Sequence, residues 1–121
     1  MQLCFHNNYS SPLSVAVMWY DPGDCGGDGG EWGTRGWWNL NPGGTVHTNV
    51  STGNRYFYYY AEAWNGAVWG GPYGPVDCTW AGFSSCQNIG STADYLSLGM
   101  REVDAGWWFW SYSTFTVNLN A

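Results

Sequence analysis

Glycine interrupts this chain so often that no amphipathic helix of useful length fits into it. The 18 glycines are spread over 121 residues, and aromatic and β-branched residues occupy most of the apolar positions between them. A glycine inside a helix costs about 1 kcal/mol relative to alanine, and β-branched and aromatic side chains lose rotamer freedom there. The sequence therefore predicts an all-β protein with long glycine-rich loops.

Side chains that alternate with a period of two predict where the strands lie. The segment 11–20, SPLSVAVMWY, alternates in this way, and the segment 55–64, RYFYYYAEAW, is the strongest strand candidate. Asn65 and Gly66 follow it and predict a hairpin. Further strands are expected on both sides of the turn at 42–44 and over 82–86, 95–103 and 113–119. About seven or eight short strands predict one antiparallel β-sandwich domain over residues 1–121.

Aromatic residues make up 20% of the chain, more than a single small core is expected to hold. Neighbours in an extended segment point in opposite directions, so Trp37 and Trp38 cannot share one face, nor can Trp107 and Trp108. The tyrosines of 56–60 pose the same problem, and we expect one of their faces in the core and the other exposed. Exposed aromatic patches on soluble proteins mark binding surfaces.

Charge excludes two classes of partner. The chain has three arginines, no lysine and nine carboxylates, which gives a net charge of −6. This charge repels nucleic-acid phosphates, and a patch for anionic lipid needs clustered cations. We therefore expect no nucleic-acid partner and no patch for anionic lipid. No membrane insertion is expected either, because no run approaches 18 apolar residues. The N-terminal MQLCFHNN lacks the basic and long apolar regions of a signal peptide.

Four cysteines, Cys4, Cys25, Cys78 and Cys86, are present without a CxxC pair or clustered histidines, which disfavours a zinc site. Disulfides are the better interpretation, the alternative being buried free thiols. Cys78 and Cys86 flank a short loop, and we expect them to form a bridge that supports the fold. Such a bridge implies an oxidising location, extracellular or periplasmic.

Charged side chains on the predicted strands admit a structural and a catalytic interpretation. A buried charge without a partner costs several kcal/mol, so we expect ion pairs among Arg55, Glu62, Arg101 and Asp104 that join neighbouring strands. Alternatively, Glu102 and Asp104 lie two positions apart on one strand face, as the carboxylate pair of a glycoside hydrolase could. No sequence signature gives a catalytic partner to His6 or His47. We expect that the protein is not an enzyme.

Four carboxylates lie among glycines in the segment 21–31. Hard oxygen ligands on a flexible loop are what calcium accepts, although the ligand spacing is not that of an EF-hand. The alternative is a solvated acidic loop. No cofactor is expected to be required, and calcium is the candidate metal. The candidate ligands are Asp21, Asp24, Asp28 and Glu31.

An ordered set of short motifs runs through nearly the whole chain: LCFHN, RGWWNLNPGG, RYFYYYAE, WGG, the pair Cys78 and Cys86, MREVDAG and STFTVNL. With these motifs the chain resembles the small bacterial family catalogued as domain of unknown function 1036. The resemblance implies relatives without implying an activity. Members usually carry a cysteine just after the Pro-Gly turn, where this chain has Gly44 and Thr45, whereas Cys25 lies in the glycine-rich loop. A bridge between Cys4 and Cys25 would be a displaced family bridge, and without it Cys4 is free.

The residues together predict a secreted, non-catalytic binding module with carbohydrate as its ligand. Tryptophan rings pack against the C–H face of a sugar, and amide groups bind its hydroxyls. The alternative is a structural protein that assembles with itself or with an extracellular surface, and a hydrolase that uses Glu102 and Asp104 is third. The predicted ligand-binding residues are Trp64, Asn65, Trp69, Trp107 and Trp108.

Overall fold

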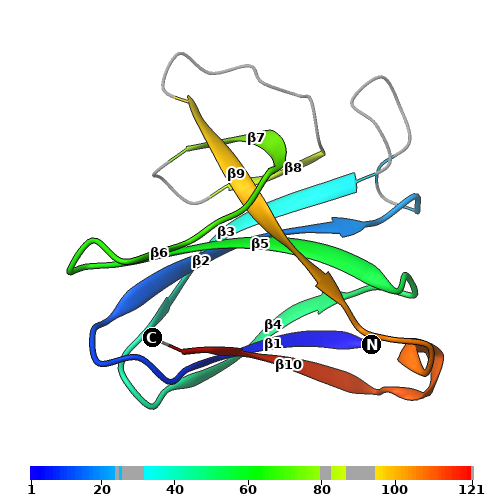
Figure 1. Ribbon diagram of the computed structural model, residues 1–121. Helices are drawn as coiled ribbons and strands as arrows, with labels where there is room; N and C mark the ends of the chain where they lie inside the picture. The colour runs from blue at the N-terminus through cyan, green and yellow to red at the C-terminus, as the bar shows by residue number, and fades with distance from the viewer. Residues whose placement is uncertain (24, 26–31, 80–82, 87–94, 121) are drawn as a thin grey trace.

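The computed structural model describes residues 1–23, 25, 32–79, 83–86 and 95–120, and it confirms an all-β protein (Figure 1). Helical structure in this part of the chain is limited to one 3-10 turn, η1, at Phe109–Ser111. No described helix is long and apolar enough to cross a membrane. The strands are β1 Gln2–Asn7, β2 Leu13–Tyr20, β3 Trp32–Leu40, β4 Thr45–Ser51, β5 Tyr56–Ala63, β6 Val68–Trp69, β7 Tyr73–Thr79, β8 Phe83–Cys86, β9 Tyr95–Asp104 and β10 Thr114–Leu119.

Two sheets divide these strands. The smaller sheet has the order β10-β1-β4, and the larger has the order β7-β9-β5-β2-β3-β8 with β6 paired to β5. The described residues thus form ten strands, more than the seven or eight predicted, because β1 and β7 were not expected. The prediction of purely antiparallel pairing is also wrong, since β1 runs parallel to β10 from the pair Gln2 and Thr114 to the pair Asn7 and Leu119.

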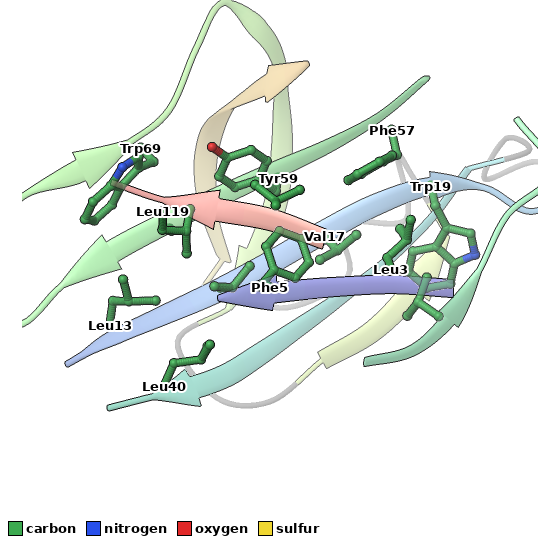
Figure 2. Packing of buried hydrophobic residues seen from close by; sticks show 14 of the residues in the cluster. Leu3, Phe5, Leu13, Val17, Trp19, Leu40, Phe57, Tyr59, Trp69 and Leu119 are labelled. Atoms are coloured by element: carbon green, nitrogen blue, oxygen red, sulfur yellow. The ribbon is translucent and has the colours of Figure 1, made fainter. Parts of the chain in front are cut away.

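The main core lies between the two sheets. Phe5 of β1 meets Tyr59 of β5 edge to face, with ring centroids 5.6 Å apart, which joins the smaller sheet to the larger one. Figure 2 shows these rings among side chains from both sheets, with Trp69 and Leu119 at one end and Trp19 and Phe57 at the other. Each of β1, β2 and β5 contributes every second residue, as the period-two alternation requires.

A second aromatic cluster covers the opposite face of the larger sheet. Tyr60 and Met100 are buried there, and Trp32, Trp37 and Tyr58 pack against them. The expectation that the second tyrosine face of β5 is exposed is therefore wrong. The expected divergence of Trp37 and Trp38 is confirmed, since Trp38 packs against the main core instead. Much of the aromatic excess is thus used in two cores rather than one.

Candidate functional site

The predicted ligand-binding residues fall at two opposite ends of strand β5. Trp107 contacts Arg55, which precedes β5, whereas Trp64 follows the last residue of that strand. Eight residues at about 3.3 Å each separate the two ends by roughly 26 Å. In Figure 1 the turn after β5 lies at the left and the loop between β9 and β10, in orange, at the right. The structure therefore does not bring the predicted ligand-binding residues together on one surface.

The first end carries the tryptophan loop, residues 105–113, between β9 and β10. The exposed fractions are 78% for Trp107, 65% for Trp108, 68% for Trp110 and 41% for Tyr112. The rings of Trp108 and Trp110 lie 5.7 Å apart between centroids, tilted by 57°. These side chains form the largest group of exposed aromatic rings among the described residues.

An ion pair holds the base of the tryptophan loop. Arg55 donates from Nε and Nη2 to the two carboxylate oxygens of Asp104, at 2.5 and 2.8 Å. The amide of Gly106 donates to the same carboxylate at 2.8 Å. The hydrogen bonds from Arg55 and then from Gly106 lower the pKa of Asp104. The Arg55 guanidinium lies 4.9 Å from the centre of the Trp107 ring, so one cation links the ion pair to the exposed rings.

The second end is closed by hydrogen bonds between three segments. The backbone amide of Trp64 donates to the carbonyl of Pro12 at 2.9 Å, although its side chain is 78% exposed. Trp69 is only 7% exposed, and its Nε1 donates to the carbonyl of Asn120 at 2.9 Å. The interpretation of Trp69 as an exposed stacking ring is wrong, because β6 turns this side chain into the main core.

Asn65 organises the turn between β5 and β6. Its Oδ1 accepts from the amide of Ala67 at 3.2 Å, and its Nδ2 donates to the hydroxyl of Tyr9 at 2.9 Å. Buried Asn7 holds the neighbouring β1–β2 loop by accepting from the amide of Tyr9 and donating to the carbonyls of Ser11 and Leu40. Both segments are therefore fixed where they meet.

A cleft of about 420 Å³ opens beside these fixed segments, and we name it the Arg101 cleft. Its walls come from the β1–β2 loop, β6, β9 and the segment after β10. Tyr9 and Trp69 stand nearly perpendicular, with centroids 5.1 Å apart. The lining residues are Tyr9, Ala67, Val68, Trp69, Arg101 and Asn120.

The predicted ion-pair network is reduced to one pair. Within the described part of the chain, Arg55 and Asp104 form the ion pair, and neither Glu62 nor Arg101 takes part in one. Glu62 accepts instead from the Tyr60 hydroxyl at 3.5 Å, and Arg101 Nε donates to the carbonyl of Gly70 at 3.4 Å. Arg101 and Glu62 are separated by register, because Arg101 lies opposite Tyr59 on β5.

Glu102 and Asp104 are held by different partners. Glu102 accepts from the hydroxyl of Tyr58 at 3.1 Å, while Asp104 is held by Arg55. Burial and this hydrogen bond raise the pKa of Tyr58 to about 12. The lowered pKa of Asp104 makes it a poor general acid, which a glycoside hydrolase needs. This geometry weakens the hydrolase hypothesis.

The cysteine predictions are corrected at one position. Cys4 is a free thiol, whereas Cys25 is disulfide-bonded, so the predicted bridge between them is wrong. Cys4 lies in the middle strand of the smaller sheet directly opposite His47, and its Sγ is 3.0 Å from Nδ1 of that histidine. Burial raises the pKa of the thiol, which opposes a role as a nucleophile. The side chains of Cys78 and Cys86 lie outside the described residues, so that bridge stays a prediction.

The predicted calcium ligands fall mostly outside the described residues. Asp24, Asp28 and Glu31 lie there, and Asp21 is described, with its carbonyl accepting from the amide of Cys25 at 2.8 Å. In the part of the chain that the structure describes, no cluster of three or more histidine, cysteine or acidic residues is arranged for a metal ion. Calcium binding by this loop stays a prediction.

Four residues of the two ends were not predicted as site residues. Trp110 and Tyr112 belong to the segment WWFWSY, and their side chains are exposed because the chain leaves β9 and forms η1 instead of continuing as a strand. The aromatic density of that segment was the available signal. Tyr9 and Asn120 reach the Arg101 cleft only through the pairing of β1 with β10, which no local pattern indicates.

Comparison with known proteins adds no relative: no family model, no curated protein and no solved structure matches the chain.

Proposed function

We propose that the protein is a non-catalytic carbohydrate-binding module and that the tryptophan loop contacts the sugar. The observation that carries this proposal is the exposure of four aromatic rings within six residues, Trp107, Trp108, Trp110 and Tyr112. Each of these rings leaves a large apolar area in water, and such patches are uncommon on monomeric proteins unless they bind something. A sugar covers them with its C–H face.

Polar groups beside the rings support carbohydrate over a purely apolar ligand. The Arg55 and Asp104 pair lies against Trp107, and side chains of this kind can bind sugar hydroxyls. The Ser111 hydroxyl donates to the carbonyl of Trp108 at 2.7 Å and restrains the turn that presents the rings. The loop therefore combines stacking surfaces with a charged and hydroxyl-bearing rim.

The scaffold that we propose for this site is a β-sandwich, supported by a core to which both sheets contribute. A location outside the cytosol, with disulfides that stabilise the domain, belongs to the same proposal. The resemblance to the family of unknown function 1036 is compatible with a carbohydrate-binding module, and it implies no activity of its own.

A glycan panel tested by isothermal titration calorimetry examines the proposal. Trp108→Ala should weaken binding by more than about 2 kcal/mol, roughly 30-fold, as is typical of a tryptophan at the centre of a binding surface. Trp64→Ala is the matched control, because Trp64 is as exposed as Trp107 but lies at the other end of β5. A panel without any binding partner, or equal losses in both variants, would contradict the proposal.

Self-assembly is the second candidate, and one observation favours it. In the described part of the chain, β10 has β1 as its single sheet neighbour, so its other edge offers backbone groups for pairing. Sedimentation velocity over a range of concentrations tests this candidate directly. Association that persists when no glycan binds would replace carbohydrate binding with assembly.

A further inference from the structure

The Arg101 cleft lies at the other end of β5 from the tryptophan loop, and the oxygen atoms that Asn120 contributes to its lining already accept hydrogen bonds within the protein. The carbonyl of Asn120 accepts from Nε1 of Trp69 at 2.9 Å. The side-chain oxygen of Asn120 accepts from Nδ2 of Asn8 at 2.6 Å. The acceptors that Asn120 brings to the cleft wall are therefore already used by the protein.

The hydroxyl of Tyr9 is left with a proton to donate. The Ala67 amide donates to Oδ1 of Asn65 and so fixes the orientation of that side-chain amide, with Nδ2 toward Tyr9. An amide Nδ2 can only donate, so the Tyr9 oxygen accepts in this contact. Its own hydrogen has no acceptor in any contact that the structure gives to Tyr9.

Arg101 offers further donors in the same cleft. Its Nε donates to the Gly70 carbonyl at 3.4 Å, which leaves the two Nη groups at the end of the guanidinium. No carboxylate among the described residues forms an ion pair with Arg101. Two Nη groups on one planar guanidinium match the two oxygens of a carboxylate.

The volume and the charge of the Arg101 cleft limit which ligands can bind there. The cleft volume of about 420 Å³ lies within the roughly 300–1,000 Å³ range of small-molecule sites. Arg101 is the one cation in the cleft lining, which suits a singly charged anion better than a phosphate dianion. Tyr9 is partly exposed and gives the ligand an aromatic surface. A pyranose ring that carries one carboxylate combines these properties.

We propose that the Arg101 cleft binds a uronic acid, with the carboxylate on the Nη groups of Arg101 and a ligand oxygen on the Tyr9 hydroxyl. This site is separate from the tryptophan loop, and the inference does not rest on the function proposed for that loop.

The indole N–H of Trp69 provides a local reporter, because this ring lines the cleft and donates to Asn120. We would titrate ¹⁵N-labelled protein with glucuronic acid at pH 7 and about 0.15 M salt, which shortens the reach of the net negative charge to about 8 Å. Trp69→Phe assigns the resonance. Glucuronic acid should shift it saturably, and glucose at the same concentrations should not.

Two variants test the named contacts. Arg101→Gln should raise the dissociation constant for glucuronic acid at least about tenfold, and Tyr9→Phe should raise it about threefold to tenfold. Arg35→Gln removes the same charge elsewhere, since Arg35 lies over the Trp19 ring, and should leave the constant unchanged. Trp108→Ala should also leave it unchanged. The dispersion of the unliganded spectrum verifies that each variant is folded.

Three results would overturn the inference. An equal response to glucose would show that the carboxylate is not recognised, and equal affinity for inorganic phosphate would show a general anion site. A loss in Arg35→Gln as large as in Arg101→Gln would assign the effect to overall charge. If Trp108→Ala loses glycan binding while its Trp69 indole resonance still responds to glucuronic acid, the tryptophan loop and the Arg101 cleft are independent sites. Either proposal can then fail without the other.

Discussion

The two ends of β5 use the same residue types in opposite ways. At the end after β5, asparagines and backbone groups join the β1–β2 loop, the β5–β6 turn and the segment after β10, and the Trp69 ring is buried. At the end before β5, the Arg55 and Asp104 ion pair holds the loop base, and three tryptophan rings project into solvent. Tryptophan content alone therefore does not identify a binding surface. What separates buried Trp69 from exposed Trp64, Trp107 and Trp108 is that Trp69 lies in a strand that faces a core, whereas the other three lie in turns.

The largest expected effect is on the free energy of unfolding, when a buried tryptophan and two exposed ones are each replaced by alanine. Trp69→Ala should lower the free energy of unfolding by about 3–5 kcal/mol, because it empties a core position and removes the hydrogen bond to Asn120. Trp64→Ala and Trp108→Ala should each change it by less than about 0.5 kcal/mol, as surface substitutions do. Urea denaturation measures all three. Similar losses in the three variants would show that the burial of Trp69 does not distinguish it energetically from the exposed rings.

A second prediction concerns the close approach of Gly71, between β6 and β7, to the backbone of β9. A Cβ at Gly71 would lie 2.7 Å from the carbonyl oxygen of Met100 and 3.1 Å from Cα of Arg101. Because backbone atoms cannot move aside as a flexible side chain can, Gly71→Ala should cost about 1–3 kcal/mol of unfolding free energy. Gly23→Ala is the matched control, since no atom lies within 4 Å of a Cβ there. Equal melting curves for the two variants would contradict the close approach.

A third prediction separates the ends by pH. The pKa of Asp104 is lowered in the fold from its ordinary value of 3.8. A lowered carboxyl pKa contributes stability that is present above the unfolded value and is lost as pH falls through the folded value. Acidification below about pH 3.8 should therefore release Arg55 and change the environment of Trp107, while the Trp69 indole resonance stays in place.

The variant Asp104→Asn provides the comparison for this titration. It removes the carboxylate that titrates, so the Trp107 indole resonance should already differ at neutral pH and should lose its transition in acid. The measurement is the position of the two indole signals across the acidic range. A transition of the Trp107 signal that survives in Asp104→Asn would assign it to another group.

The smallest expected effect is on the thiol of Cys4, which lies in neither end. With 1% of its surface exposed and its pKa raised by burial, Cys4 should not react with iodoacetamide in the native protein at neutral pH. Unfolding in denaturant without reductant should make it reactive. Mass spectrometry of the alkylated peptide checks this. Protection that persists in the unfolded, unreduced chain would mean that Cys4 is bridged.

The alternation of side chains in the sequence predicted the strands whose burial depends on neighbouring residues. Alternation located β2 and β5 because both strands bury one face against the main core. It did not predict the second cluster, because which aromatic rings cover Tyr60 depends on the order of strands in the sheet. Strand β1 was missed because its inward-facing residues include Asn7, a polar side chain satisfied by the carbonyls of Ser11 and Leu40.

The candidate sites were predictable to a smaller degree. The aromatic run around Trp107 and Trp108 predicted exposed rings, but the physical reason differs: the segment is a turn before η1 and not a strand, so both rings are exposed. The separation of these rings from Trp64 follows from the direction of β5, and the burial of Trp69 from its position in β6. Arg101 was predicted to form an ion pair because an unpaired buried charge is costly, but Arg101 is exposed and donates to the carbonyl of Gly70 instead.

The parallel pairing of β1 with β10 also affects the order of events during synthesis. The ribosome releases β1 first among these strands and β10 last, so the middle strand of the smaller sheet waits with one edge unpaired while the rest of the chain emerges. Contacts between such distant segments form slowly because a long loop must close first. Until β10 arrives, the apolar side chains of Leu3 and Phe5 depend on the larger sheet for cover, and such incompletely covered intermediates are prone to aggregation.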